Sequence, residues 1–264
     1  MSLRSSLQYE PRELEFGTSG RRGKVVDLTQ LEVYINALAE LEYLQSLDAS
    51  EGGIVRGEEF FLARDLRPSS DSFVPELEGR GEIAQAIVAA IEDAGMRAIN
   101  LGATPTPALS CYALARGKGS MMVTGSHIPF DRNGYKTYSS KGELRKQQEA
   151  PIRERASALR RRLYQQHPGE SRFDERGMFK TGHQGLPAEH TEAGYAWIKR
   201  FTSFFRGASL GGTRVLVYQH SAVGRDLLVK ILESMGAEVV ASGRSETFVT
   251  EGSAITLVTH DKTP

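Results

Sequence analysis

The sequence predicts an α/β fold: a three-layer α/β/α domain with a mixed, partly parallel sheet, followed by a partial second α/β domain. Two observations lead to this class. Stretches with apolar residues at helical spacing alternate with short apolar runs that are typical of buried strands. Strands separated by helices of this length favour a sheet with helices on both faces. The same alternation starts again after a loop-like stretch at 167–187, which indicates a second unit.

The first half of the chain contains the elements of the first sheet. Residues 30–47 and 82–94 carry apolar side chains three and four positions apart, so we expect amphipathic helices there. The apolar runs at 60–63, 98–101 and 121–123 are bounded by polar or glycine-containing segments, so we expect buried strands.

Polar loops follow each of these expected strands. Arg64-Asp65 follow the first strand, Gly102–Pro107 the second, and the stretch from Thr124 onwards the third. Ligands bind at the carboxyl ends of the strands in sheets of this kind. We therefore expect the three loops to converge on one rim and to form a site there.

The segment 142–166 is strongly charged, and we expect it to be mostly helical with an interruption near Pro151. Its Arg160-Arg161-Arg162 run could contact phosphate, but a solvated helix face is the favoured interpretation because acidic residues are interspersed and no aromatic residues interleave. Residues 167–187 are rich in glycine, proline and histidine and are expected to form a linker or long loop.

The remaining chain has the pattern of a βαβ unit. Aromatic residues recur at packing spacing in 190–205, a buried strand is expected at 213–221, a helix at 224–235 and a strand at 238–240. We therefore expect a first domain over residues 1–188 and a partial second domain over residues 189–264.

Composition excludes several classes of protein. Lysine plus arginine total 33 and aspartate plus glutamate total 33, and this neutral balance argues against a nucleic-acid partner. No apolar run is long enough to span a membrane, and the N-terminus lacks the apolar core of a signal peptide. The single cysteine, Cys111, suits a reducing compartment and is expected to be a small buried hydrophobe. We expect a cytoplasmic protein whose residues 1–12 form a loosely held lead-in.

Ser126 and His127 are adjacent in the third loop. A serine hydroxyl is a weak nucleophile without a neighbouring base, and hydrolase triads bring that base from a distant part of the chain. His127 is expected to point away from Ser126, and no G-x-S-x-G motif surrounds the serine. A serine hydrolase is therefore disfavoured, whereas a simple loop closure remains an alternative.

Two further clusters could bind anions. Glycines surround Thr18, Ser19, Arg21 and Arg22 in residues 15–23, and such a stretch can form an anion-binding nest, although a flexible turn explains it nearly as well. The spacing matches neither a P-loop nor a dinucleotide-binding fingerprint.

The second cluster lies in residues 63–72. Arg67 with Ser69 and Ser70 could bind phosphate or cap the next helix. Asp65 is expected to form a structural ion pair with Arg64 that supports the rim.

Taken together, the order and form of these clusters resemble a known family. The sequences FGTSGRRG, RDLRPSS, TPTPALS and TGSHIPFDRNGYK resemble motifs of the phosphohexomutase superfamily, and most closely those of bacterial phosphomannomutase and phosphoglucomutase. The last is the most diagnostic, because the active-site loop of the family reads T-[AG]-S-H-x-P followed by N-G-x-K. The resemblance covers residues 14–145 strongly and extends more loosely into the second domain.

The resemblance implies a mechanism and roles for particular residues. Ser126 would carry a phosphoryl group, donate it to a hexose 1- or 6-phosphate, and regain one from the resulting hexose bisphosphate. His127 would stabilise the serine loop, Arg22 would clamp phosphate, and the Asn133-Gly134 turn would bring Lys136 towards Ser126. The phosphate-binding residues would be Thr18, Ser19, Arg21, Arg67 and Asn133. A complete enzyme would use Mg²⁺ between the serine phosphate and a D-x-D-x-D-R loop.

The departures from the family are informative. The sequence contains no D-x-D, and after Val249 it stops resembling the family. We therefore expect roughly the N-terminal half of such an enzyme, inactive as a mutase on its own, with only the phosphate on Ser126 available to a metal. The alternatives are a non-catalytic fragment or pseudoenzyme that binds phosphate and a phosphatase that uses Ser126 as transient acceptor.

Overall fold

A central sheet forms the middle layer of the larger part of the molecule. The computed structural model describes residues 1–17 and 20–249. The strands follow the order β1-β7-β6-β2-β5, with β8 paired to β7. Strand β2 is parallel to β5 and β6, whereas β7 is antiparallel to β6 and β1, so the sheet is mixed and partly parallel. The strands are β1 (Arg21–Lys24), β2 (Glu59–Arg64), β5 (Arg97–Ala103), β6 (Ser120–Val123), β7 (Arg132–Ser139) and β8 (Gly142–Glu143).

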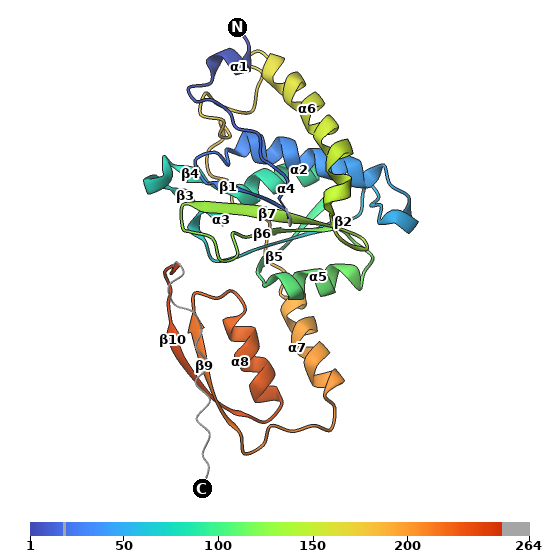
Figure 1. Cartoon of the computed structure of the whole chain (residues 1–264), viewed down its shortest axis with the longest axis vertical. Helices are drawn as coiled ribbons and strands as arrows, with labels where there is room; N and C mark the ends of the chain where they lie inside the picture. Colours follow the sequence, from blue (N-terminus) through green and yellow to red (C-terminus); the bar gives the residue numbers. More distant parts are fainter. Residues whose placement is uncertain (18–19, 250–264) are drawn as a thin grey trace.

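Helices cover both faces of this sheet (Figure 1). Helices α2 (Gln30–Gln45) and α4 (Ile83–Asp93) lie on one face, and α5 (Thr106–Leu114) lies on the other. Successive side chains of a strand point to opposite faces. Phe60 and Leu62 of β2 accordingly belong to the larger apolar cluster with α2, and Phe61 belongs to the cluster with α5. The predicted three-layer α/β/α class is confirmed.

Helix α2 is not amphipathic in the expected sense. Its polar positions are buried as well: helix α6 (Glu149–Gln165) covers Glu32, whereas Glu40 faces strands β1 and β7 of the sheet. The buried Glu32 pairs with Arg160 of α6 at 2.8 Å, and the buried Glu40 pairs with Arg21 of β1 at 2.6 Å. Paired charges replace the solvent that an exposed polar face would have met.

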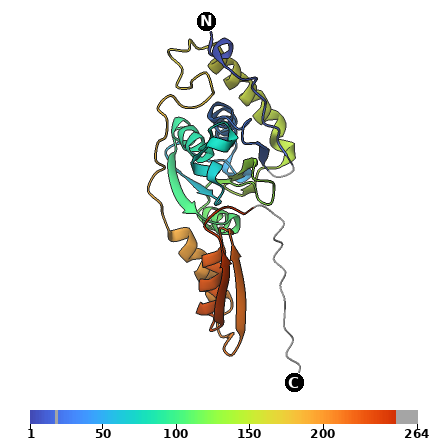
Figure 2. The same cartoon turned by 90° about the vertical axis from the view of Figure 1, so that its left-hand side faces the viewer.

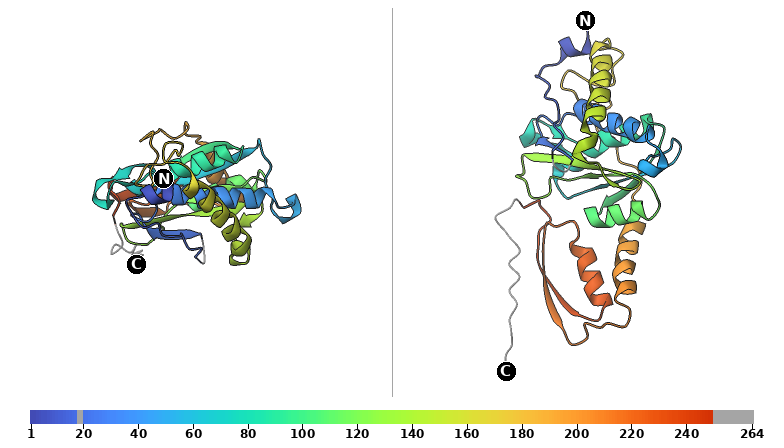
Figure 3. Two further views of the ribbon diagram at one scale, coloured as in Figure 1. Left: turned by 90° about the horizontal axis from the view of Figure 1, so that it is seen from above. Right: turned by 45° about the vertical axis from the view of Figure 1, so that its right-hand side comes forward.

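Two expectations for the ends of this domain are wrong. Residues 1–12 are not a loose lead-in: the short helix α1 (Leu3–Ser6) buries Leu3, whose amide donates to the carbonyl of Gln166 at 2.8 Å. Figure 3 shows α1 beside the end of α6. Pro151 does not interrupt α6 but lies in its first turn, where the missing amide hydrogen is tolerated.

The three arginines of the run at 160–162 on α6 differ in their exposure to solvent. Arg161 and Arg162 are exposed, as the solvated-face prediction requires. Arg160 is buried and binds Glu32, so for this residue the prediction is wrong.

Residues 166–191 run along the side of the first domain as a long irregular connection (Figure 2). The predicted lack of regular elements is confirmed, but the segment is more than a linker. Phe173 and Phe179 are buried in the main apolar cluster, and their rings stack with centroids 4.9 Å apart. The proposed domain boundary at residue 188 remains a prediction.

The C-terminal βαβ unit comprises α7 (Glu192–Phe204), β9 (Arg214–His220), α8 (Arg225–Ser234) and β10 (Glu238–Arg244). Strands β9 and β10 are parallel, and α8 connects them, which confirms the predicted βαβ pattern. Helix α7 lies below α5 in Figure 1 and connects the unit to the first domain. Strand β9 is not buried as expected: α8 packs on one face, while Leu216 and Tyr218 on the other face are 62% and 42% exposed.

Several short elements complete the described chain. They are η1 (Ala49–Glu51), α3 (Pro68–Asp71), β3 (Phe73–Val74), η2 (Pro75–Leu77), β4 (Arg80–Gly81) and η3 (Lys146–Gln148). Among the described residues, no helix is long and apolar enough to cross a membrane.

Candidate active site

The serine loop, residues 124–131, connects β6 to the antiparallel strand β7. Because β2 runs parallel to β6, the loop that follows β2 leaves the sheet at the same edge. The amide of Asp65, just after β2, donates to the carbonyl of Val123 at 2.9 Å. The predicted convergence of these two loops is confirmed.

The third loop begins at the same edge but reaches a different partner. Strand β5 is parallel to β2, so Gly102 also lies at the carboxyl end. A Cβ atom at Gly102 would lie 2.5 Å from the carboxyl carbon of Glu189, so this loop packs against the segment that leads to α7. Arg64 also reaches Glu189, at 3.6 Å. The third loop thus supports the C-terminal βαβ unit.

Asp65 is the centre of the polar contacts between the first two loops. One carboxylate oxygen, Oδ2, accepts from the Thr124 hydroxyl at 2.8 Å and from the Gly125 amide at 3.2 Å. The other, Oδ1, accepts from the Arg67 amide at 3.0 Å and from the Ser70 hydroxyl at 2.8 Å. A buried carboxylate is stable only when such donors replace water. The predicted structural role of Asp65 is confirmed.

The expected ion-pair partner of Asp65 is wrong. Asp65 pairs with Arg67, whose Nε lies 3.5 Å from Oδ2. Arg64 instead pairs with Asp71 at 2.8 Å. The reason is strand alternation: consecutive residues at the end of β2 point to different sides.

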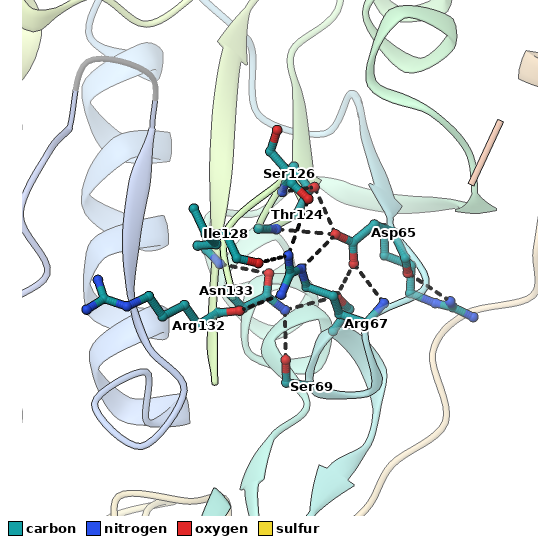
Figure 4. A network of polar contacts seen from close by, with 12 residues as sticks. Asp65, Arg67, Ser69, Thr124, Ser126, Ile128, Arg132 and Asn133 are labelled. Carbon is teal, nitrogen blue, oxygen red and sulfur yellow. Dashed lines mark hydrogen bonds and ion pairs between the residues drawn. The ribbon is translucent and has the colours of Figure 1, made fainter. Parts of the chain in front are cut away.

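Arg67 supports the serine loop from within. Its side chain is only 1% exposed. One terminal nitrogen donates to the carbonyls of Pro129 at 2.8 Å and Arg132 at 3.0 Å, and the other donates to those of Ser126 at 3.3 Å and Ile128 (Figure 4). These contacts order the loop backbone and give no support to the predicted phosphate contact of Arg67. Nor does its side chain cap helix α3, which was the alternative prediction.

Ser126 has a left-handed backbone conformation, with φ = +55°. This conformation is strained for a residue with a Cβ atom, and such strain is typical of functional sites. The amide of Ser126 donates to the Thr124 hydroxyl at 2.8 Å, which helps to hold it. The exposed hydroxyl points away from Arg67 in Figure 4.

His127 does not point away from Ser126, contrary to expectation. Its Nδ1 lies 3.4 Å from the Ser126 hydroxyl oxygen, because the left-handed backbone at the serine turns the two side chains to one side. Both side chains are exposed, so a ligand from solvent can reach them.

Asn133 and Gly134 are part of strand β7 and do not form the predicted turn. The chain reverses earlier, in the serine loop. The buried amide group of Asn133 donates to the hydroxyls of Ser69 at 2.9 Å and Ser70 at 3.1 Å, so it supports the loop from below. Glycine is required at 134 because a Cβ atom there would lie 2.0 Å from a main-chain oxygen of β1.

Arg22 and Lys136 lie on the same face of the sheet. Arg22 pairs with Gly134 across the β1–β7 ladder, so Lys136 is its diagonal neighbour, with Cα atoms about 7 Å apart. The Nε of Arg22 is buried and has no hydrogen-bond partner among the described residues. The Nε atoms of Arg64 and Arg80 share this property, so the predicted phosphate contact of Arg22 remains a prediction.

Lys136 is not seen next to the serine. It pairs with Met122, four residues before Ser126, and its Nζ lies 3.9 Å from a carboxylate oxygen of Glu143. In the described part of the chain no hydrogen bond joins Lys136 to Ser126. Its predicted catalytic role remains a prediction.

Three predicted phosphate ligands remain: Arg21, Thr18 and Ser19. Arg21 is buried and binds Glu40; burial alone would lower the pKa of its guanidinium, but the Glu40 charge and hydrogen bond outweigh this and raise it. Arg21 is therefore part of the core beneath the sheet. Thr18 and Ser19 lie outside the described residues.

The described residues do not supply a magnesium site. No group of three or more histidine, cysteine or acidic residues in residues 1–17 and 20–249 is arranged to hold a metal ion. The Asp65 carboxylate contacts the serine loop, but both its oxygens already accept hydrogen bonds from protein donors.

These observations define a class of protein: an α/β/α domain that presents a strained serine at the carboxyl edge of its sheet. Comparison with known proteins identifies the family. Residues 13–162, more than half of the chain, match the family model described as phosphoglucomutase/phosphomannomutase, alpha/beta/alpha domain I. The chain therefore belongs to the phosphoglucomutase/phosphomannomutase family.

Individual relatives agree with this assignment. A phosphomannomutase of Sinorhizobium fredii is 37% identical over 236 residues, which are 89% of this chain and 44% of the relative. A phosphomannomutase of Salmonella muenchen is 34% identical and shares 89% of this chain and 42% of its own length. A phosphoglucosamine mutase of Frankia casuarinae is 31% identical over 130 residues, 48% of this chain and 26% of the relative. The chain thus spans less than half the length of the relatives that it matches.

A solved structure shares the fold. The crystal structure of a phosphoglucomutase/phosphomannomutase family protein from Burkholderia thailandensis aligns with a TM-score of 0.57 and 18% identity. The alignment covers 89% of this chain and 44% of that protein.

Proposed function

We propose that this chain is the N-terminal, phosphoryl-carrying part of a phosphohexomutase of phosphomannomutase type. The observation that carries the proposal is the serine loop: an exposed Ser126 hydroxyl in a strained backbone conformation, 3.4 Å from His127 Nδ1, on a loop fastened by Asp65 and Arg67. Its sequence has the T-G-S-H-x-P form of the family motif. Membership of the family supports a sugar phosphate as substrate.

In the proposed reaction, the phosphoryl group on Ser126 moves to the free hydroxyl of a hexose 1- or 6-phosphate. The bond from phosphorus to the serine oxygen breaks, a bond to the sugar oxygen forms, and the sugar proton passes to the serine oxygen. The hexose bisphosphate then returns its other phosphoryl group to Ser126. This intramolecular phosphotransfer leaves the serine phosphorylated at the end of each cycle.

The residues of this chain would contribute position and charge rather than a strong base. Arg67 and Asp65 hold the loop, His127 contacts the serine oxygen, and Arg22 offers an unpaired guanidinium donor. Lys136 would neutralise charge on the transferring group if substrate brings it closer. Pre-arranged charges and geometry are the main source of acceleration in phosphoryl transfer.

A second candidate is a form that carries phosphate without turnover. It is favoured by the sequence itself, which contains no D-x-D, the motif that binds Mg²⁺ in complete enzymes of the family. We expect these 264 residues alone to accept a phosphoryl group on Ser126 but not to interconvert mannose 1- and 6-phosphate. A coupled mutase assay, with host enzyme excluded by a mock purification, tests this expectation, and robust interconversion by these residues alone would contradict it.

The first test is phosphorylation of Ser126. Purified protein is incubated with glucose 1,6-bisphosphate and Mg²⁺, and its intact mass and phosphopeptides are measured. We expect one added phosphoryl group, located on Ser126, in the wild type and in the control Ser203→Ala, which removes an exposed serine of α7. Ser126→Ala should remain unmodified. A phosphoryl group found on another residue would exclude Ser126 from the mechanism.

The same preparation tests the phosphatase alternative. Phosphorylated protein is left in buffer without sugar phosphate, and the loss of phosphate is followed by mass. A mutase-type serine should retain its phosphoryl group for hours, whereas loss within minutes would favour a phosphatase.

A further inference from the structure

Phe248 covers the arginine that orders the serine loop. The guanidinium carbon of Arg67 lies 4.3 Å from the centroid of the Phe248 ring. The same ring lies 6.3 Å from that of Phe130, which belongs to the serine loop itself. Phe248 comes from the segment 245–249, directly after β10, more than a hundred residues away in the sequence. A residue of the C-terminal βαβ unit therefore contacts both the loop and its internal support.

The segment 245–249 is held by the C-terminal unit. The amide of Ser245 donates to the carbonyl of His220 at 3.1 Å, and the amide of Val249 donates to the hydroxyl of Ser221 at 3.1 Å. Arg225 donates to the carbonyls of His220 at 2.8 Å and Ser245 at 2.5 Å. These bonds fix the segment to the end of β9, so the position of Phe248 follows the position of the unit.

The contact between Phe248 and Arg67 should help to keep the serine loop ordered. The terminal N–H groups of Arg67 bind loop carbonyls, and its guanidinium carbon lies over the Phe248 ring. A cation over an aromatic ring is stabilised most when water is excluded, and Arg67 is 1% exposed. Without the ring, water gains access to the guanidinium and competes for its hydrogen bonds.

We propose that Phe248 is a positioning residue that couples the C-terminal unit to the serine loop. While the unit is docked, the ring keeps Arg67 and Phe130 covered and the loop ordered; when the unit moves away, the loop loosens. The importance of the coupling for catalysis rests on the proposed function, because it assumes that Ser126 carries the phosphoryl group.

The test is hydrogen exchange of the serine loop in the unphosphorylated chain. Peptides that cover residues 124–132 are compared in the wild type, Phe248→Ala and Phe248→Tyr. The matched control is Phe204→Ala, which removes a 79% exposed ring of the same unit, one that contacts Phe205. We expect exchange of the loop about tenfold faster in Phe248→Ala, unchanged exchange in Phe204→Ala, and near wild-type exchange in Phe248→Tyr. Peptides of β2 and β6 should not change in any variant.

Two outcomes would overturn the proposal: loop exchange that is unchanged in Phe248→Ala, or equally raised in Phe204→Ala. If Phe248→Ala also speeds hydrogen exchange in β9 and β10, the proposal is decided by comparing loop exchange in Phe248→Leu with that in Phe248→Tyr. Leucine keeps most of the apolar volume without the ring, so faster loop exchange in Phe248→Leu than in Phe248→Tyr supports the coupling, and equal exchange rejects it. Failure of Ser126 to accept phosphate would leave this result unaffected, so the two proposals fail separately.

Discussion

Asp65 links the two loops of the site through its carboxylate, beside the contacts that Arg67 makes. Its two oxygens accept four hydrogen bonds, from main-chain and side-chain donors in the segments after β2 and β6. Asp65 is 8% exposed, so these donors replace most of its hydration, and Arg67 offsets its charge. The strained φ of Ser126 is maintained by this surrounding network, because Thr124 binds both Asp65 and the Ser126 amide.

Asp65→Asn should therefore lower stability and loosen the loop. The amide nitrogen of asparagine cannot accept hydrogen bonds, so two of the four donors lose their partner, each at a cost of about 1–3 kcal/mol in the free energy of unfolding. Urea denaturation measures this, and Ser126 phosphorylation should slow in parallel. The control is Asp131→Asn, an exposed aspartate of the serine loop itself, which should stay within about 0.5 kcal/mol of wild type. Equal losses in both variants would mean that Asp65 has no special role.

Part of this site was predictable from sequence. The loop after β6, its Ser126 and the converging loop after β2 follow from short apolar runs with polar exits. The roles of Arg67, Asn133 and Gly134 did not follow, because each depends on contacts across strands or loops. An Asn-Gly pair occurs both in hairpin turns and in strands that a neighbouring backbone approaches closely, so the pair alone does not distinguish the two.

Among the elements, α2 shows the limit of periodicity. The apolar stripe correctly predicted a helix, but part of its burial comes from α6, which lies more than a hundred residues later in the chain. Arg160 reaches Glu32 from α6, and Tyr164 donates to the same carboxylate at 2.6 Å. Burial alone would lower the pKa of Arg160, but its hydrogen bond and charge interaction with Glu32 raise it. The layer over α2 is therefore joined by charge as well as by apolar contacts.

Arg160→Ala should destabilise the first domain strongly. It leaves the buried Glu32 carboxylate without its cation, and removal of one partner of a buried pair typically costs about 3–5 kcal/mol. The neighbour Arg161 is exposed on the same helix, so Arg161→Ala should change stability by less than about 0.5 kcal/mol. Thermal and urea melts compare the two. If they are equally stable, the α2–α6 ion pair contributes nothing and α6 is held by its apolar face alone.

At the scale of the whole molecule, the apolar core is distributed unevenly. The clusters of the first domain bury aromatic and aliphatic side chains on both faces of a central sheet. In the C-terminal unit, the buried apolar residues are Ala193, Val217, Ile231 and Ala237. The same unit exposes large apolar side chains, including Tyr195, Phe204, Leu216 and Leu228. Stability within a protein follows local burial, so the two parts should differ in how readily they open.

Sequence patterns predicted the βαβ elements of this unit but not their exposure, because periodicity does not reveal which faces are covered.

We expect the C-terminal unit to open before the first domain does. Amide hydrogens of β9 and β10 should exchange at least about a hundredfold faster than those of β2 and β6, because local opening costs far less than global unfolding where few apolar groups are buried. Adjacent residues of β9 provide a matched pair: Val217 is 5% exposed and Leu216 is 62% exposed. Val217→Ala should accelerate exchange in β9 and β10 without affecting β2 and β6, and Leu216→Ala should change neither. Hydrogen exchange with mass detection resolves these peptides. Equal protection of both parts, with Val217→Ala weakening them together, would show instead that the described chain unfolds as one cooperative unit.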